Sequence, residues 1–302
     1  MISLSTVWNH KAAPGLAGVF AAGRRIGFES FELGVSSARA DLRAVEAEIE
    51  QNGTQISSIH AVWSEGEVPR ESRFGDWIAE PDEARRREGV RLVRETLDAA
   101  RRVGAKAVVL HAGTLPLPDA WPLQQELRRL AASSPGPLRD PPGLGRFIED
   151  RKRVAPPYLR SLETSLGELC EHAPDVAVAL ENRYYINDLP HGDEFQRLFD
   201  RVGAPNLRAW HDVGHAYLLG RIGFLDQLDL LELCRGRLAG VHMHDIRGVE
   251  DHRPPGMGDF NFACLAEHLG PDVIRVMEIA PKFAAKEVKR GRLHLAEMYG
   301  IE

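Results

Sequence analysis

The segment WHDVGHA, residues 210–216, carries two side chains that could bind a metal ion. Asp212 and His215 lie three residues apart, where an apolar stretch that predicts a strand runs into a turn. A carboxylate and an imidazole suit a borderline divalent ion such as Zn²⁺ or Mn²⁺, and Gly214 between them lets the backbone turn sharply. A D-x-x-H pair also occurs as a structural hydrogen bond, so the interpretation depends on what the other strands carry at their ends.

Further acidic and histidine residues stand where other apolar stretches end. Apolar and alternating patterns predict eight strands, over residues 2–8, 26–34, 56–63, 105–113, 176–185, 207–217, 238–248 and 273–281. Six of them carry ligand-type residues at or near their C-terminal ends, namely His60, His111, Glu181, Asp212, His215, His242, His244 and Glu278. Alternation places Glu181 on the face of the small alanines before it, and puts His242 and His244 on one face. Glu32 marks the tip of the second strand.

Helical patterns alternate with these strands. Apolar spacing and stop signals predict helices over residues 38–51, 81–103, 123–132, 158–172 and 193–202, and a last helix that ends near Tyr299. Strands alternating with helices predict an α/β protein with a parallel sheet, and eight of them match a (β/α)8 TIM barrel. Active sites of such barrels lie at the C-terminal strand ends. Six strands that end in His, Asp or Glu therefore predict a metal site there rather than an ordinary polar rim.

Length and composition limit the class of protein. With 302 residues, 43% of them hydrophobic, the chain can bury a large core, and we interpret residues 1–302 as a single barrel domain. The net charge of −6 disfavours nucleic acid as a partner, although a local basic patch would be compatible with it. Three widely spaced cysteines without a C-x-x-C motif predict reduced packing thiols and a cytoplasmic protein. No secretory pattern and no membrane-spanning apolar run is found, so no membrane partner is expected.

A long segment at about residues 114–157 interrupts the alternation of strands and helices. It is rich in proline and locally basic, with Arg128, Arg129, Arg139, Arg146, Arg151, Lys152 and Arg153. Long loops after a strand are usually functional lids or mobile segments. The charge of this insertion suggests that it could bind an anionic substrate.

Five motifs, in order along the chain, resemble one family. They are ALEN at 179–182, HDVGHA at 211–216, VHMHD at 241–245, DHRPPGMGDFNF at 251–262 and MEIA at 277–280. Together with the predicted barrel, this set resembles the xylose isomerase-like TIM-barrel superfamily over nearly the whole chain. That superfamily includes sugar and sugar-phosphate isomerases and epimerases, and endonuclease IV-type AP endonucleases. The PPGMGDF run, residues 254–260, resembles a loop whose glycines allow close approach to a ligand, with an ordinary turn as the alternative.

The resemblance implies specific roles. The one-metal members bind a divalent ion, here Mn²⁺, Zn²⁺, Co²⁺ or Mg²⁺, through positions that correspond to Glu181, Asp212, His242 and Glu278. His215 is then a substrate or supporting residue, and His244 is a rival to His242 as ligand. Arg183 could bind a substrate oxygen or phosphate, or form a surface salt bridge.

The resemblance also implies a reaction. The expected function is metal-dependent isomerisation or epimerisation of a sugar or sugar phosphate, by proton transfer through a metal-stabilised enediolate. Glu181 and Glu278 would remove and return the proton. The expected partner is a small carbohydrate, and a homo-oligomer is compatible with the sequence.

The main alternative is a zinc phosphodiesterase of the endonuclease IV type that acts at abasic sites in DNA. Those enzymes hold three zinc ions, and His60, His111 and His252 are candidates for the additional ligands, with Glu250 or Asp251 as a loop carboxylate. The acidic net charge and the lack of interleaved basic and aromatic residues speak against DNA binding. A barrel that binds a ligand without catalysis is a third interpretation.

Overall fold

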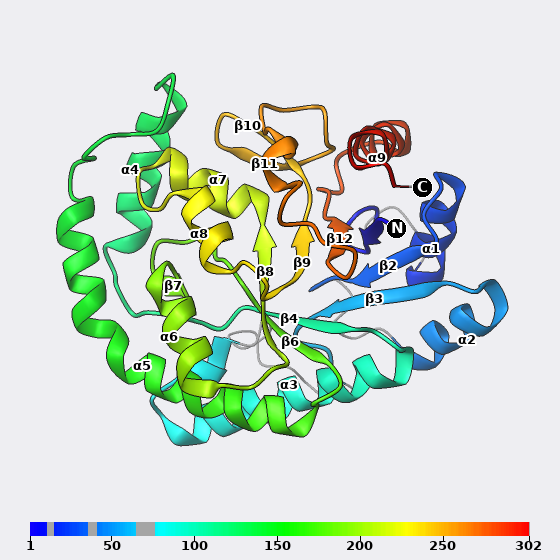
Figure 1. Cartoon of the computed structure of the whole chain (residues 1–302), viewed down its shortest axis with the longest axis horizontal. Coiled ribbons are helices and arrows are strands. Elements are labelled where there is room, and N and C mark those ends of the chain that lie inside the picture. The colour runs from blue at the N-terminus through cyan, green and yellow to red at the C-terminus, as the bar shows by residue number, and fades with distance from the viewer. Residues whose placement is uncertain (11–14, 36–40, 65–75, 302) are drawn as a thin grey trace.

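The chain forms a closed barrel of parallel strands in the computed structural model, which describes residues 1–10, 15–35, 41–64 and 76–301. Neighbouring strands pair in the order β1-β12-β9-β8-β6-β4-β3-β2, and helices surround them (Figure 1). The predicted (β/α)8 TIM barrel is therefore confirmed. The barrel strands are β1 (Ser3–Ser5), β2 (Ser30–Leu33), β3 (Gln55–His60), β4 (Ala107–Leu110), β6 (Ala177–Glu181), β8 (Leu207–Asp212), β9 (Leu238–His242) and β12 (Ile274–Met277).

The barrel interior is filled by a few small side chains and one large one. A buried cluster of Ala107, Val109, Ala179, Trp210, Ala239 and Val276 comes from five of the parallel strands. Gly240 on β9 leaves the space that the Trp210 ring occupies, because a Cβ at that position would meet the indole. Glu181 follows Ala179 on the inward face of β6, as the alternation predicted, so its carboxylate lies at the C-terminal mouth of the barrel.

Helices cover the barrel on the outside (Figure 1). They are α1 (Gly15–Arg25), α2 (Leu42–Asn52), α3 (Glu83–Val103), α4 (Ala120–Ala132), α5 (Leu144–His172), α6 (Asp193–Val202), α7 (Val213–Arg221), α8 (Gln227–Leu233) and α9 (Ala285–Tyr299), with 3₁₀ turns η3 (Asp76–Ala79) and η4 (Phe262–Leu265). Asp41 and Asp82 cap the N-termini of α2 and α3, and Gly53 and Gly104 end these helices in the left-handed conformation. The predicted start of α2 at residue 38 lies outside the described residues. Among the described residues, no helix combines the length and the apolar character needed to cross a membrane.

All eight barrel strands are shorter than predicted, and two of them show what ends the strand. The strand predicted over residues 207–217 ends at Asp212, and α7 begins at Val213. The reason is local, since the Asp212 carboxylate accepts a hydrogen bond of 2.8 Å from the His215 backbone N–H and thereby caps α7. The strand predicted over residues 238–248 ends at His242, and the chain then forms an antiparallel hairpin of β10 (Asp245–Arg247) and β11 (Glu250–Arg253).

The insertion is more helical than its prolines suggested. The helix predicted at 158–172 begins at Leu144 and contains Pro156 and Pro157. Proline inside a helix costs about 3 kcal/mol, but Leu144, Phe147 and other apolar residues of α5 are buried, so tertiary packing outweighs the penalty. A short pair, β5 (Gly113–Thr114) and β7 (Asp188–Leu189), joins the start of the insertion to the segment after β6.

Candidate metal centre

Four ligand-type side chains meet at the C-terminal mouth of the barrel. Glu181, Asp212 and His242 are the last residues of β6, β8 and β9, and Glu278 directly follows β12. Their ligand atoms all lie within 4.8 Å of one another. His242 Nδ1 is 2.8 Å from Glu181 Oε1, 3.3 Å from Glu278 Oε2 and 3.5 Å from Asp212 Oδ2. We call these four residues the central cluster.

The central cluster fits a divalent cation. All four side chains are buried, and three of them are carboxylates. Burial alone would raise the pKa of Glu181 and Asp212, but the histidines beside them hold both pKa values well below the usual range. Three ionised carboxylates in a buried space require positive charge, and carboxylate with imidazole suits Mn²⁺, Co²⁺, Zn²⁺ or Mg²⁺.

Glu32 on β2 orients the imidazole of His242. The Nε2 atom of His242 lies 3.2 Å and 3.3 Å from the two oxygens of Glu32, and Ser58 donates a hydrogen bond of 2.9 Å to the same carboxylate. Glu32 and His242 are both fully buried. Histidines that bind metals usually donate their other ring N–H to a carboxylate of this kind. Glu32 therefore directs Nδ1 of His242 toward the three carboxylates of the central cluster. The sequence did not assign this role to Glu32.

His244 is held in a different way from His242. Its Nε2 atom lies 3.1 Å from both oxygens of Asp212, and its Nδ1 atom accepts a hydrogen bond of 2.9 Å from the His252 backbone N–H. Because Nδ1 is an acceptor, Nε2 carries the proton and donates to Asp212. Both ring nitrogens of His244 are thus used, and the side chain supports Asp212.

A second group of ligand-type residues lies on the β3–β4 side of the centre. His60, His111 and Glu181 have ligand atoms within 4.8 Å of one another. Arg183 also donates to Glu181 Oε2 at 2.8 Å, and His111 Nε2 lies 2.9 Å from the same oxygen. Arg183 forms a second ion pair with Asp188 at 3.4 Å. The arginine is therefore a buried partner of the centre, not the surface salt bridge that was one expectation.

A third group lies toward the β10–β11 hairpin. Asp212, His215 and His252 form it, although His215 stands on α7 and not on a strand. His252 Nδ1 is 3.0 Å from Asp251, and its Nε2 is 3.5 Å from Glu278. Burial opposes the charge on His252, but Asp251 and Glu278 raise its pKa well above the usual value. No described contact joins Glu250 to these residues, so Asp251 is the loop carboxylate that the fold brings here.

The sequence pattern matches the family model of the xylose isomerase-like TIM barrel over residues 20–274. The chain belongs to this family. Similar solved structures include L-ribulose 3-epimerase, at 17% identity and a TM-score of 0.67, with 99% of this chain and 94% of that chain covered. A 3-keto-D-glucoside 4-epimerase from E. coli has 21% identity and a TM-score of 0.64, with 98% of both chains covered. The IOLI protein with a zinc atom has 13% identity and a TM-score of 0.65, covering 99% of this chain and 98% of that chain.

These structural likenesses show a common fold at low identity. No curated protein matches the sequence. The resemblance read from the five motifs is confirmed by the family model.

A cavity of about 490 Å³ opens beside the central cluster of this family member. Its lining includes His111, His215 and His252 from the edges of the centre, and Trp121 and Arg128 from the insertion. The volume is within the range of small-molecule sites. The insertion thus contributes a wall of the cavity next to the candidate metal centre.

Only one basic residue of the insertion lines this cavity. Arg128 does, whereas Arg129, Lys152 and Arg153 pair with acidic residues of their own helices. Arg151 is buried against Glu194 at 2.6 Å. Most of the positive charge of the insertion is therefore neutralised locally, and binding of an anionic substrate by this segment stays a prediction.

The glycine-rich run at residues 254–260 serves a structural purpose. The backbone N–H groups of Gly256, Gly258 and Phe260 donate to the Asp245 carboxylate at 2.8–3.0 Å. A Cβ on Gly258 would meet that carboxylate and the Ile246 carbonyl. The close backbone approach that the sequence suggested is thus to Asp245, a residue whose role the sequence analysis missed.

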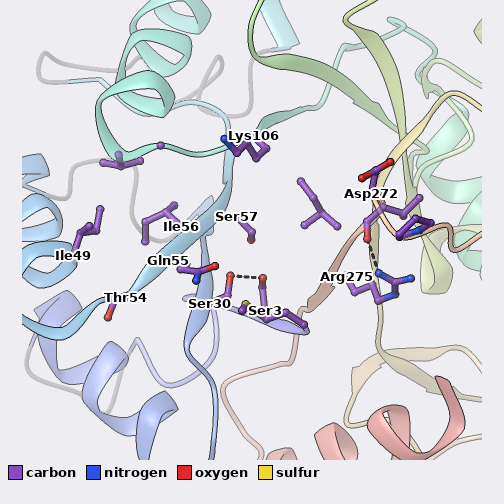
Figure 2. A pocket seen from close by; sticks show the side chains of 16 residues that line it. Ser3, Ser30, Ile49, Thr54, Gln55, Ile56, Ser57, Lys106, Asp272 and Arg275 are labelled. Atoms are coloured by element: carbon purple, nitrogen blue, oxygen red, sulfur yellow. Dashed lines mark hydrogen bonds between the residues drawn. The ribbon is translucent and has the colours of Figure 1, made fainter. Parts of the chain in front are cut away.

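A second cavity has a volume of about 460 Å³, and Figure 2 shows the side chains that line it. Ser3, Ser30 and Gln55, at the N-terminal ends of three strands, line it together with Lys106. Arg275 in this cavity donates to the Leu269, Gly270 and Val273 carbonyls. Its residues are remote from the central cluster, and the N-terminal face of a TIM barrel commonly contributes to stability.

Proposed function

We propose that the chain is a divalent-metal-dependent isomerase or epimerase that acts on a sugar. The observation that carries this proposal is the placement of two carboxylates of the central cluster, Glu181 and Glu278, at the ends of separate strands, next to a cavity of small-molecule size. When bound by Glu181, Asp212, His242 and Glu278, the ion would act as a Lewis acid on a carbonyl and the adjacent hydroxyl of the substrate. The chain itself must then supply a base for the carbon-bound proton.

Glu278 is the better placed of the two bases. The side chain of Glu181 is 1% exposed, and its Oε2 is already held by Arg183 and His111. Glu278 is 9% exposed and has histidines on either side, His242 and His252. Burial opposes ionisation of Glu278, but these histidines lower its pKa to about 2, so its carboxyl group is ionised at neutral pH. Arg183 holds one oxygen of Glu181, so that its other oxygen faces the cluster.

Hydrogen exchange at carbon tests this proposal. The metal-loaded protein is incubated in heavy water with a panel of ketoses, ketose phosphates and disaccharides that contain a ketose, and deuterium incorporation is followed by NMR. Glu278→Gln keeps an oxygen near the metal but accepts no proton, so exchange and turnover should fall by about 10²–10⁴-fold. Glu297→Gln, an exposed carboxylate on α9, is the matched control and should leave exchange unchanged. Exchange that persists in Glu278→Gln would contradict the assignment of the base.

The second candidate function is that of an endonuclease IV-type phosphodiesterase. The observation in its favour is that two further groups of ligand-type residues adjoin the central cluster and could hold additional ions. One is His60, His111 and Glu181, and the other is Asp212, His215 and His252. A duplex with one abasic site is incubated with the same protein preparations. Cleavage at that site, without hydrogen exchange on any ketose, would replace the isomerase proposal.

A further inference from the structure

An aromatic wall extends from the candidate metal centre to the protein surface. Among the described residues, the exposed aromatic side chains are Trp121, at 57%, and Tyr185, at 39%. Their ring centroids lie 5.9 Å apart, and Tyr184 packs against Tyr185 at 4.9 Å. All three rings line the 490 Å³ cavity that reaches His111 and His252. Exposed aromatic side chains gathered in one cavity are typical of a binding surface, because their burial by a ligand is favourable.

The wall is fixed in place by the insertion. Gln124 of α4 donates to the Tyr184 carbonyl at 2.9 Å and accepts from the Ile186 N–H at 3.0 Å. The Arg128 guanidinium contacts the Tyr184 hydroxyl and donates to the Val249 carbonyl at 3.2 Å, which connects α4 to the β10–β11 hairpin. The buried apolar residues of α4, Ala120, Leu127 and Ala131, pack with α7 in a separate apolar cluster. Because these side chains are already held in place, binding a ligand to them costs little conformational entropy.

The charges around the cavity favour an uncharged ligand. The acidic lining residues are Asp76, Asp188 and Asp251. Of the basic ones, Arg183 is paired with Glu181 and Asp188, and His252 is paired with Asp251 at 3.0 Å. Arg128 lies over the Tyr184 ring, 5.3 Å from its centroid. Binding of a phosphate group requires several positively charged hydrogen-bond donors that are not already in ion pairs, whereas sugar hydroxyls form good hydrogen bonds with carboxylates.

We propose that Trp121, Tyr184 and Tyr185 form a subsite for a second, non-reacting sugar ring, so that the substrate is an uncharged glycoside and not a free or phosphorylated monosaccharide. This inference rests on the proposed function and names its substrate class. The C–H groups on one face of a pyranose carry slight positive charge and stack on the negative face of an aromatic ring. The reacting ring then lies at the central cluster, and the linked ring lies against Trp121.

Direct binding measurements test the subsite without turnover. Metal-loaded protein is titrated in a calorimeter with cellobiose, maltose, glucose, glucose 6-phosphate and a dinucleotide. The disaccharides should bind about tenfold more tightly than glucose or its phosphate. Trp121→Ala should weaken disaccharide binding by about 3- to 10-fold, the loss expected for one stacking contact, and leave glucose binding unchanged. Trp121→Phe should retain most of the affinity.

The same titrations include a control variant and can contradict the proposed subsite. Leu293→Ala, which removes an exposed apolar side chain on α9, should have no effect. Because Trp121 is exposed, its replacement leaves the core intact. Equal disaccharide affinity in Trp121→Ala and wild type, or tighter binding of glucose 6-phosphate or the dinucleotide, would overturn the subsite. Disaccharide selectivity without any hydrogen exchange would instead defeat the proposed function and leave the subsite as a binding site.

Discussion

His242 and His244 are chemically identical residues whose replacement should have different consequences for metal affinity. His242 Nδ1 faces the three carboxylates of the central cluster, whereas His244 donates to Asp212 and accepts from the His252 backbone. Loss of a residue that only supports a ligand typically costs 10–100-fold in metal affinity. His244→Ala should fall in that range, and His242→Ala, which removes a ligand, should cost at least about tenfold more.

Glutamine variants make the comparison sharper. In place of His244, a glutamine can donate its amide N–H to Asp212 and accept at its oxygen, so His244→Gln should recover part of the affinity. In place of His242, glutamine lacks the imidazole nitrogen, so His242→Gln should remain as weak as the alanine variant. Affinity is measured by titrating metal-free protein with Mn²⁺ in competition with a chelator.

Folding must be checked separately, since both histidines are fully buried. His244 stacks on His252 with ring centroids 4.2 Å apart, so an alanine there leaves a cavity that can cost a few kcal/mol. Thermal melts of the metal-free variants report this cost independently of the metal. A larger loss of affinity in His244→Ala than in His242→Ala, between variants of equal thermal stability, would refute the assignment.

Two further outcomes follow from buried groups away from the cavity. Glu32→Gln should weaken metal binding by about 10–100-fold without unfolding the barrel, because an amide accepts the His242 N–H less strongly than a carboxylate does. The same competition titration measures this loss. Unchanged affinity would show that Glu32 does not position His242. Burial raises the pKa of Cys170 and Cys234 to about 12, so at pH 8 only on the order of 10⁻⁴ of either thiol is ionised. Neither should react with a disulfide reagent before unfolding, and reaction of either cysteine in native protein, counted by mass spectrometry, would contradict this.

The strand ends could be predicted because two signals coincide there. Continuous apolar runs identify buried parallel strands, and a barrel brings all their C-terminal ends to one mouth. This is why the ligand-type residues could be placed together at one mouth from the sequence, and the family resemblance then selected Glu181, Asp212, His242 and Glu278 among them. The resemblance favoured His242 over its rival His244, but no local pattern shows the reason, because the difference is made by Glu32, which is 210 residues away from His242 along the chain.

The features that were not predicted correctly from the sequence depend on contacts that form only in the folded protein. The strand predicted over residues 207–217 continued past Asp212 because the apolar pattern continues, whereas the Asp212 cap redirects the backbone into α7. The start of α5 was placed too late because two prolines normally break a helix. Here the buried apolar face of α5, which no local pattern reveals as buried, compensates for them. The aromatic wall escaped notice because Trp121 and Tyr185 are brought together only by the folded insertion.

We expect Arg183 to decide whether the group formed by His60, His111 and Glu181 can hold a second ion. Its guanidinium donates to Glu181 Oε2 at 2.8 Å, the same oxygen that His111 approaches at 2.9 Å and His60 at 3.8 Å. An ion bound by that group would lie within about 4 Å of the guanidinium, where like charges repel by about 4 kcal/mol per unit charge at the effective dielectric of a protein site. The arginine therefore supplies the positive charge that a second ion would bring. We expect one tightly bound ion per chain by elemental analysis of purified protein, and a second ion in Arg183→Met but not in the control Arg128→Met. Three ions per wild-type chain would show that the guanidinium does not exclude them, and would favour the phosphodiesterase over the isomerase.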